Sequence, residues 1–223
     1  MGIAFFDLDR TLLSINSGSR WISWELRRGR LSPWQVARAA YYLGLYRLGR
    51  GRLEDALVEA ISTLKGTSAA DTRRRVEEFY ELHVRAAYRP GGLKALAGHK
   101  EQGDVTALLS STSVYLAEAV GRELSLDAVI CNRFEVDGSG EHTGRSQGGL
   151  CYGSGKLHHA QAFAQSRGVP LDECVFYTDS ISDLPVLERV GRPVVVNPDR
   201  PLRKVAVRKR WEVVDWGRPA SGG

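Results

Sequence analysis

The chain has few cysteines and no long apolar run. Its 223 residues contain no Cys-X-X-Cys pair, and the three cysteines are Cys131, Cys151 and Cys174. An odd, scattered set of thiols fits reduced cysteines inside a cell better than a disulfide framework. The longest apolar stretch, residues 34–48, is interrupted by Arg38 and Arg47 and is too short to span a bilayer. Because Asp7 interrupts the first apolar run, we expect no secretory leader and a cytoplasmic protein.

Positive charge is plentiful, but the marks of a nucleic-acid binder are missing. The formal net charge of +5 and the pI near 9.2 favour anionic partners such as phosphorylated metabolites. Six basic residues lie within eleven positions: Arg200, Arg203, Lys204, Arg208, Lys209 and Arg210. No nucleic-acid motif accompanies them, so we predict no nucleic-acid partner. A solvated basic face is the favoured interpretation, and contact with an acidic membrane surface stays open as the less favoured one.

Nucleotide and zinc motifs are also missing. Gly155-Lys156 does not complete a GxxxxGK[ST] loop, because Leu150 and Leu157 occupy the first glycine and final hydroxyl positions. The five histidines lack companion ligands at metal-binding spacing, so we assign them to structure or surface.

The chain has two parts that differ in the pattern of their apolar residues. In residues 14–88, apolar residues recur at helical spacing, which predicts several helices and no strand. After residue 89, strands and helices alternate. The predicted strands are 105–109, 174–177 and 194–196, the helices are 114–124, 156–167 and 183–190, and a hairpin lies within 129–152.

This alternation predicts an α/β fold with a doubly wound, Rossmann-like parallel sheet and an inserted all-helical domain. Residues 1–13 and 89–223 would form the core. Residues 14–88 would form a helical cap over the strand ends, well placed to close over a crevice.

Two acidic residues follow the first predicted strand. The apolar run Ile3–Phe6 ends at Asp7, and Asp9 comes two positions later. Buried carboxylates are costly unless they are paired or bind metal, so this pair suggests a site. In open α/β sheets, the ligand crevice lies outside the carboxyl ends of the strands. A pair of N-capping aspartates after an edge strand is the less favoured interpretation.

Polar residues also follow the later predicted strands. Ser110-Ser111-Thr112-Ser113 precedes a helix, and such a helix start is an anion site by geometry and dipole. Asp179 and Asp183 follow another strand, and Lys156 stands at a glycine-flanked helix start. Hard oxygen ligands of this kind select Mg²⁺, which commonly bridges carboxylates and a substrate phosphate. An aspartate can attack phosphorus, and a second carboxylate can protonate the leaving oxygen and then activate water.

This order of motifs resembles the haloacid dehalogenase superfamily, specifically its phosphoserine-phosphatase-like subfamily with a helical cap. Asp7-Leu8-Asp9-Arg10-Thr11 is similar to the DxDxT motif, and Ser110, Lys156 and the Asp179/Asp183 pair match the second, third and fourth motifs. The resemblance implies a phosphatase with Asp7 as nucleophile and Asp9 as general acid/base, assisted by Ser110 and Lys156. It also implies Mg²⁺ held by Asp7, the backbone carbonyl of Asp9 and Asp179, with Asp183 in support.

The expected substrate is a small phosphorylated metabolite. We predict that six residues bind it or its phosphate: Asn16, Ser110, Ser111, Thr112, Lys156 and Ser182. The resembled phosphatases carry a glutamate for the substrate amine where this chain has Asn16, and usually an asparagine where it has Ser182. A neutral Asn16 lacks the ionic attraction for an ammonium group. Phosphoserine is therefore one candidate beside histidinol phosphate and lysophosphatidate.

Two other functions stay open at this point. A phosphotransferase or mutase would pass the same aspartyl-phosphate to an alcohol instead of water. A non-catalytic module would use the basic residues 200–210 on acidic membranes, although the intact acid set argues against it. The sequence does not separate a monomer from a homodimer.

Overall fold

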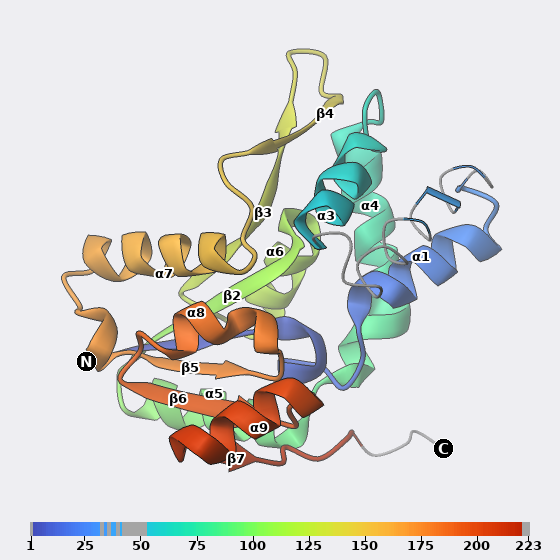
Figure 1. Ribbon diagram of the computed structural model, residues 1–223. Coiled ribbons are helices and arrows are strands. Elements are labelled where there is room, and N and C mark those ends of the chain that lie inside the picture. The colour runs from blue at the N-terminus through green and yellow to red at the C-terminus, as the bar shows by residue number, and fades with distance from the viewer. Residues whose placement is uncertain (1, 32–33, 35–36, 39–40, 42–52, 220–223) are drawn as a thin grey trace.

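The computed structural model describes residues 2–31, 34, 37–38, 41 and 53–219. Its centre is a seven-stranded sheet in the order β4-β3-β2-β1-β5-β6-β7 (Figure 1). Neighbouring strands are parallel except for the antiparallel pair of β3 and β4. The strands are β1 (Ile3–Phe6), β2 (Val105–Ser113), β3 (Ala128–Val136), β4 (His142–Gln147), β5 (Val175–Thr178), β6 (Arg192–Val196) and β7 (Glu212–Val214).

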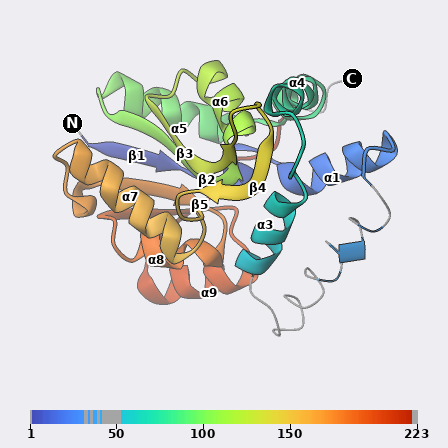
Figure 2. The same cartoon turned by 90° about the horizontal axis from the view of Figure 1, so that it is seen from above.

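Helices cover both faces of the sheet (Figure 2). The described α-helices are α1 (Ser17–Arg27), α3 (Leu53–Ser62), α4 (Ala69–Phe79), α5 (Pro90–Glu101), α6 (Val114–Glu123), α7 (Ser154–Ser166), α8 (Leu184–Leu187) and α9 (Arg200–Lys209). Shorter helical turns span Leu8–Leu12, Tyr80–Val84, Arg85–Ala87, Leu171–Glu173 and Ile181–Asp183. None of the helices in the described ranges is long and apolar enough to cross a membrane.

The central strand β1 explains why its sequence is apolar without a break. Its side chains alternate between the faces, so Ile3 and Phe5 join the cluster under α7, α8 and α9. Ala4 and Phe6 join the cluster on the other face, under α5 and α6. A strand that is buried on both faces has no polar side, which is typical of parallel sheets.

The predicted α/β fold with a doubly wound parallel sheet and a helical insertion is confirmed, with two corrections. The hairpin predicted within residues 129–152 forms between β3 and β4, but it is not a separate unit, because β3 also pairs in parallel with β2 in the main sheet. The helix predicted over residues 183–190 forms only over Leu184–Leu187, preceded by a 3-10 turn. The apolar stretch at residues 34–48 lies largely outside the described residues. The elements α5, α9 and β7 are not among those predicted from the sequence.

The chain enters and leaves the helical insertion at adjacent points. Leu13 pairs with Tyr88 in an antiparallel bridge. Backbone hydrogen bonds of 2.8 Å flank this bridge, one from Ser14 N to Ala87 O and one from Arg89 N to Leu12 O. The two linkers therefore lie side by side, next to the turn Leu8–Leu12 that carries Asp9.

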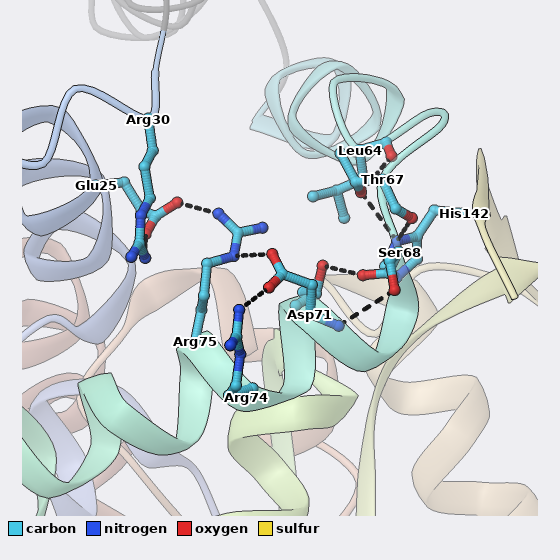
Figure 3. Close-up of polar contacts among 10 residues, drawn as sticks. Glu25, Arg30, Leu64, Thr67, Ser68, Asp71, Arg74, Arg75 and His142 are labelled. Carbon is cyan, nitrogen blue, oxygen red and sulfur yellow. Dashed lines mark hydrogen bonds and ion pairs between the residues drawn. The ribbon is translucent and has the colours of Figure 1, made fainter.

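The insertion also contacts the β3–β4 hairpin. The loop before α4 forms a bridge through Ser68 to Glu141, and His142 N donates to Thr67 O at 2.9 Å. Figure 3 shows His142 facing Thr67, whose hydroxyl lies 3.1 Å from the ring Nδ1. The hairpin thus holds one end of the insertion against the core.

Candidate active site

The sheet order brings the three polar strand ends together. β1 lies between β2 and β5, with Phe6 opposite Leu108 on one side and Tyr177 on the other. Asp7 follows directly, and its backbone N–H donates to Tyr177 O at 2.9 Å. The polar residues that follow these strands therefore meet at one edge of the sheet, where parallel α/β folds place their ligands.

Lys156 joins two of these acids. Its Nζ donates to Asp7 Oδ1 and to Asp183 Oδ2, each at 2.8 Å, and the residue is only 1% exposed. Thr178 Oγ1 donates to the same Asp183 oxygen at 2.6 Å. The lysine stands in the first turn of α7, and Gly155 before it lies so close to the preceding loop that a Cβ would come 2.1 Å from Leu150 O.

The carboxylates at this edge outnumber the lysine. Burial raises the pKa of Asp7 to about 6, with Asp183 adding to the effect and Lys156 opposing it. Burial, followed by the charges of Asp7 and Asp183, raises the pKa of Asp179 to about 8. Burial alone would lower the pKa of Lys156, but Asp183 and Asp7 outweigh it and raise that pKa. The acids therefore repel one another, and an added cation would relieve this repulsion.

The donor set fits Mg²⁺. No three His, Cys, Asp or Glu side chains within the described ranges form a ligand group by themselves. Mg²⁺ requires no such group, since it is commonly held by one or two carboxylates together with water and substrate phosphate. Asp7 and Asp179 supply hard oxygen atoms at the strand ends, and burial is the main cause of their raised pKa values, to which the neighbouring acids add.

Asp9 occupies the tight turn Leu8–Leu12, apart from the lysine. Its backbone is extended (ψ 128°), and the following Arg10 is left-handed (φ 59°), so the chain reverses direction here. Ser17 N, at the start of α1, donates to Asp9 Oδ1 at 2.8 Å. Burial raises the pKa of Asp9, and this favours a carboxyl that can carry a proton. Thr11 Oγ1 lies 3.5 Å from Asp179 Oδ1, which links this turn to the end of β5.

The hydroxyl-rich segment Ser110–Ser113 lies at an irregularity in β2. The pairing with β3 shifts register between Leu109 and Ser113. Ser110 is buried, and its Oγ accepts from Thr112 N at 3.4 Å. Ser113 caps α6 by accepting from Leu116 N. The backbone therefore curls at Ser111 and Thr112, at the start of a helix, where an anion is stabilised.

Two predicted substrate residues have local partners. Asn16 is the N-cap of α1, and its Oδ1 accepts from Ser19 N at 2.8 Å. Ser182 Oγ lies 2.9 Å from Ser180 Oγ. The structure thus joins Lys156 directly to Asp7 and Asp183, while Asn16 and Ser182 lie on flanking segments.

Three residues of this network were missed from the sequence. Thr178 holds Asp183, Thr11 contacts Asp179, and the Ser17 amide holds Asp9. The position of Thr178, one residue before Asp179 at the end of a strand, was the available signal. The contact of Ser17 is made by its backbone, which carries no signal in the side-chain type.

Comparisons with known proteins show which family this chain resembles. The family model of haloacid dehalogenase-like hydrolases matches residues 4–188. A probable phosphatase of Mycobacterium tuberculosis is 31% identical over 98% of this chain and 76% of its own length. A phosphoserine phosphatase of the same organism is 30% identical over 96% of this chain and 70% of its own. A histidinol-phosphatase of Neisseria meningitidis is 27% identical, covering 96% and 98%.

Solved structures repeat the fold. A protein of unknown function from Bordetella pertussis has a TM-score of 0.87 at 29% identity, covering 96% of this chain and 98% of its own. A substrate-bound phosphoserine phosphatase has a TM-score of 0.69 at 18% identity, covering 97% and 93%. At that identity the likeness concerns the fold alone. Together with the family model and the phosphatase relatives, these matches show that the chain belongs to the haloacid dehalogenase-like hydrolase family and is an enzyme of its phosphatase type.

Proposed function

We propose that this enzyme is a Mg²⁺-dependent phosphomonoesterase that works through an aspartyl-phosphate on Asp7. The observation that carries the proposal is the buried bridge from Lys156 to Asp7 and Asp183. This bridge holds the carboxylate of Asp7 at the end of β1, beside the segment Ser110–Thr112 of β2 that would bind the phosphate. This arrangement supports a site in which Asp7 is the nucleophile and Lys156 and Ser110–Thr112 bind the phosphate.

The first step transfers the phosphoryl group to the protein. The phosphoryl oxygens face Lys156 and the hydroxyl and amide groups of Ser110, Ser111 and Thr112, which neutralise and orient them. A carboxylate oxygen of Asp7 forms a bond to phosphorus as the bond to the ester oxygen breaks. The leaving oxygen takes the electron pair and accepts a proton from Asp9.

The second step releases phosphate. Asp9, now ionised, takes a proton from water as the water oxygen attacks phosphorus. The bond between phosphorus and the Asp7 oxygen breaks and its electron pair restores the carboxylate, while Asp9 keeps the proton taken from water and is ready for the next cycle. The raised pKa of Asp9 suits a group that must gain and lose a proton within each cycle.

Mg²⁺ would be held by Asp7, the backbone carbonyl of Asp9 and Asp179, with Asp183 in support. When bound, it supplies positive charge that offsets the phosphoryl oxygens. We propose further that residues 14–88 act as a cap, since α1 starts at the amide that holds Asp9. Asn16 and Ser182 would face the substrate from the two sides of the site.

The substrate is proposed to be a small phosphorylated metabolite. Relatives named phosphoserine phosphatase and histidinol-phosphatase support phosphoserine and histidinol phosphate as candidates, and lysophosphatidate remains a third. Asn16 supplies no carboxylate for an ammonium group, so we expect phosphoserine to have no advantage over the other two.

The test is a phosphate-release screen with the three candidates, with and without Mg²⁺. Asp7→Asn should abolish release and the phosphorylated protein seen by mass spectrometry after acid quench. The matched control is Asp172→Asn, which neutralises an exposed carboxylate on a surface turn and should leave the rate unchanged. Full turnover by Asp7→Asn would sink the mechanism. Labelled water identifies the acceptor: label in the phosphate indicates hydrolysis, and a phosphorylated alcohol indicates a transferase.

A further inference from the structure

A buried asparagine on β3 lies between two loops of the proposed active site. Asn132 is 3% exposed and faces the register shift of β2, where Ser113 is its partner across the strands. A primary amide in such a place is costly unless its donor and acceptor are both satisfied. Asn132 satisfies both, and each partner belongs to a different loop.

One half of the amide holds the phosphate side of the site. Asn132 Nδ2 donates to Ser111 O at 2.6 Å. Ser111 lies between Ser110 and Thr112, within the curl that is proposed to face the phosphoryl oxygens. Because β2 and β3 lose their regular pairing here, a side chain replaces a bond that the strand ladder would otherwise supply.

The other half holds the lysine side. Asn132 Oδ1 accepts from Cys151 N at 2.8 Å. The next residue, Tyr152, accepts from Gly155 N at 2.9 Å and from Lys156 N at 3.4 Å, which starts α7. Cys151 itself is fully buried, so the packing of its side chain holds this loop in addition to the hydrogen bond of its backbone.

The orientation of the amide follows from its partners. A reversed amide would set its NH₂ group against the Cys151 N–H and its oxygen against the Ser111 carbonyl, so only one orientation forms two hydrogen bonds. A single rigid side chain therefore sets the separation between the phosphate cradle and the lysine.

We propose that Asn132 is a positioning residue that holds the Ser110–Thr112 cradle in register with Lys156, so that both reach one phosphoryl group. The proposal rests on the proposed function for its catalytic consequence, but its geometric content concerns phosphate binding alone. Partners that orient catalytic ligands typically contribute a factor of about 10 to 100 in affinity or activity.

The experiment compares two substitutions at this position. Asn132→Leu keeps the approximate volume and removes both hydrogen bonds. Asn132→Asp keeps the acceptor for Cys151 N and removes the donor to Ser111 O. We expect kcat/KM to fall by about 10- to 100-fold in Asn132→Leu, with a higher KM and a lower kcat. Asn132→Asp should bind orthophosphate about 10- to 100-fold more weakly, because it loses the hydrogen bond to Ser111 O.

A neighbouring variant controls for a loss of stability alone. Cys131→Ala alters the adjacent buried residue of β3, whose thiol packs in the hydrophobic cluster under α6. It should lower the melting temperature while KM and orthophosphate affinity keep their wild-type values. Asn132 variants that resemble Cys131→Ala in this respect would overturn the proposal.

Orthophosphate binding, measured by calorimetry, separates the two proposals. If the wild-type protein binds orthophosphate but releases none from any substrate, the proposed function fails while the test of Asn132 still stands. If the wild-type protein hydrolyses its substrate and both Asn132 variants bind orthophosphate as it does, the positioning role fails and the proposed function survives.

Discussion

Two buried charge clusters of this chain use the same residue types in opposite proportions. At the core strand ends, one lysine faces Asp7 and Asp183, and Asp179 lies close by. In the helical insertion, one carboxylate, Glu25, faces Arg75 at 2.5 Å and Arg30 at 3.3 Å (Figure 3). The core has an excess of buried negative charge, whereas the insertion has an excess of positive charge.

Exposure separates the two excesses. The side chain of Lys156 is 2% exposed, so water screens its charge very little. In the insertion, Glu25 is equally buried at 3%, but the side chain of Arg30 is 35% exposed and Arg75 also contacts Asp71. Water can solvate the extra positive charge, but it solvates the extra negative charge far less, since the side chain of Asp7 is only 10% exposed. The comparison supports the proposal that the core cluster receives a cation and a ligand, while the other cluster holds α1 against α4.

Removing Lys156 should have the largest effect. Lys156→Met leaves Asp7 and Asp183 buried without their cation, which should lower the free energy of unfolding by about 3–5 kcal/mol. Loss of one preorganised donor to the phosphoryl group should lower kcat by about 10²–10³-fold. Urea denaturation and steady-state kinetics measure the two effects. Lys209→Met, which breaks an exposed pair with Glu188, is the control. A wild-type kcat in Lys156→Met would contradict the proposal that the core cluster binds the phosphoryl group through this lysine.

A change of shape without a change of charge should come next. In Gly155→Ala, the new Cβ would meet Leu150 O at 2.1 Å, so the loop before Lys156 must move. A displacement of about 1 Å at a catalytic group can cost about 10²-fold in rate, and we expect kcat/KM to fall by that order.

The same loop provides the matched control for this variant. Gly149→Ala introduces a Cβ with no heavy atom of the described structure within 4 Å, and it should leave kcat/KM unchanged. Equal losses in the two variants would indicate that the loop tolerates no side chain anywhere, which would remove the specific link to Lys156.

The two regions also differ in how well the sequence predicts them. The strand ends at Asp7, Ser110 and Asp179 could be predicted because a parallel sheet gathers its carboxyl ends at one edge. The parallel pairing of β3 with β2 could not be predicted, because Asn132 interrupts the apolar residues of β3 and its outer half is exposed. Such a pattern is typical of a hairpin strand. The helix α9 could not be predicted either, because its sequence is largely basic and only Leu202 and Ala206 are buried in it. The role of Glu25 depends on Arg75, fifty positions away, and no local pattern announces that contact.

Removing the carboxylate of the insertion should have the smallest of the three effects. Glu25→Gln leaves Arg75 and Arg30 without their buried partner, but Asp71 and solvent still compensate these arginines. We expect a loss of about 1–3 kcal/mol in the free energy of unfolding. The kcat should keep its wild-type value, because the contacts of Glu25 lie between α1 and α4, not at the strand ends.

An exposed ion pair between the insertion and the core calibrates this effect. Arg122 contacts Glu77 at 3.4 Å, with side chains 60% and 50% exposed. Arg122→Ala should therefore cost less than about 1 kcal/mol and lose even that effect at high salt. The loss in Glu25→Gln should depend less on salt, because the side chains of Glu25 and Arg75 are only 3% and 15% exposed and ions reach them less easily. If high salt reduces the loss of stability equally in both variants, the Glu25 cluster behaves as a surface ion pair. It would then differ from the core cluster only in its degree of burial.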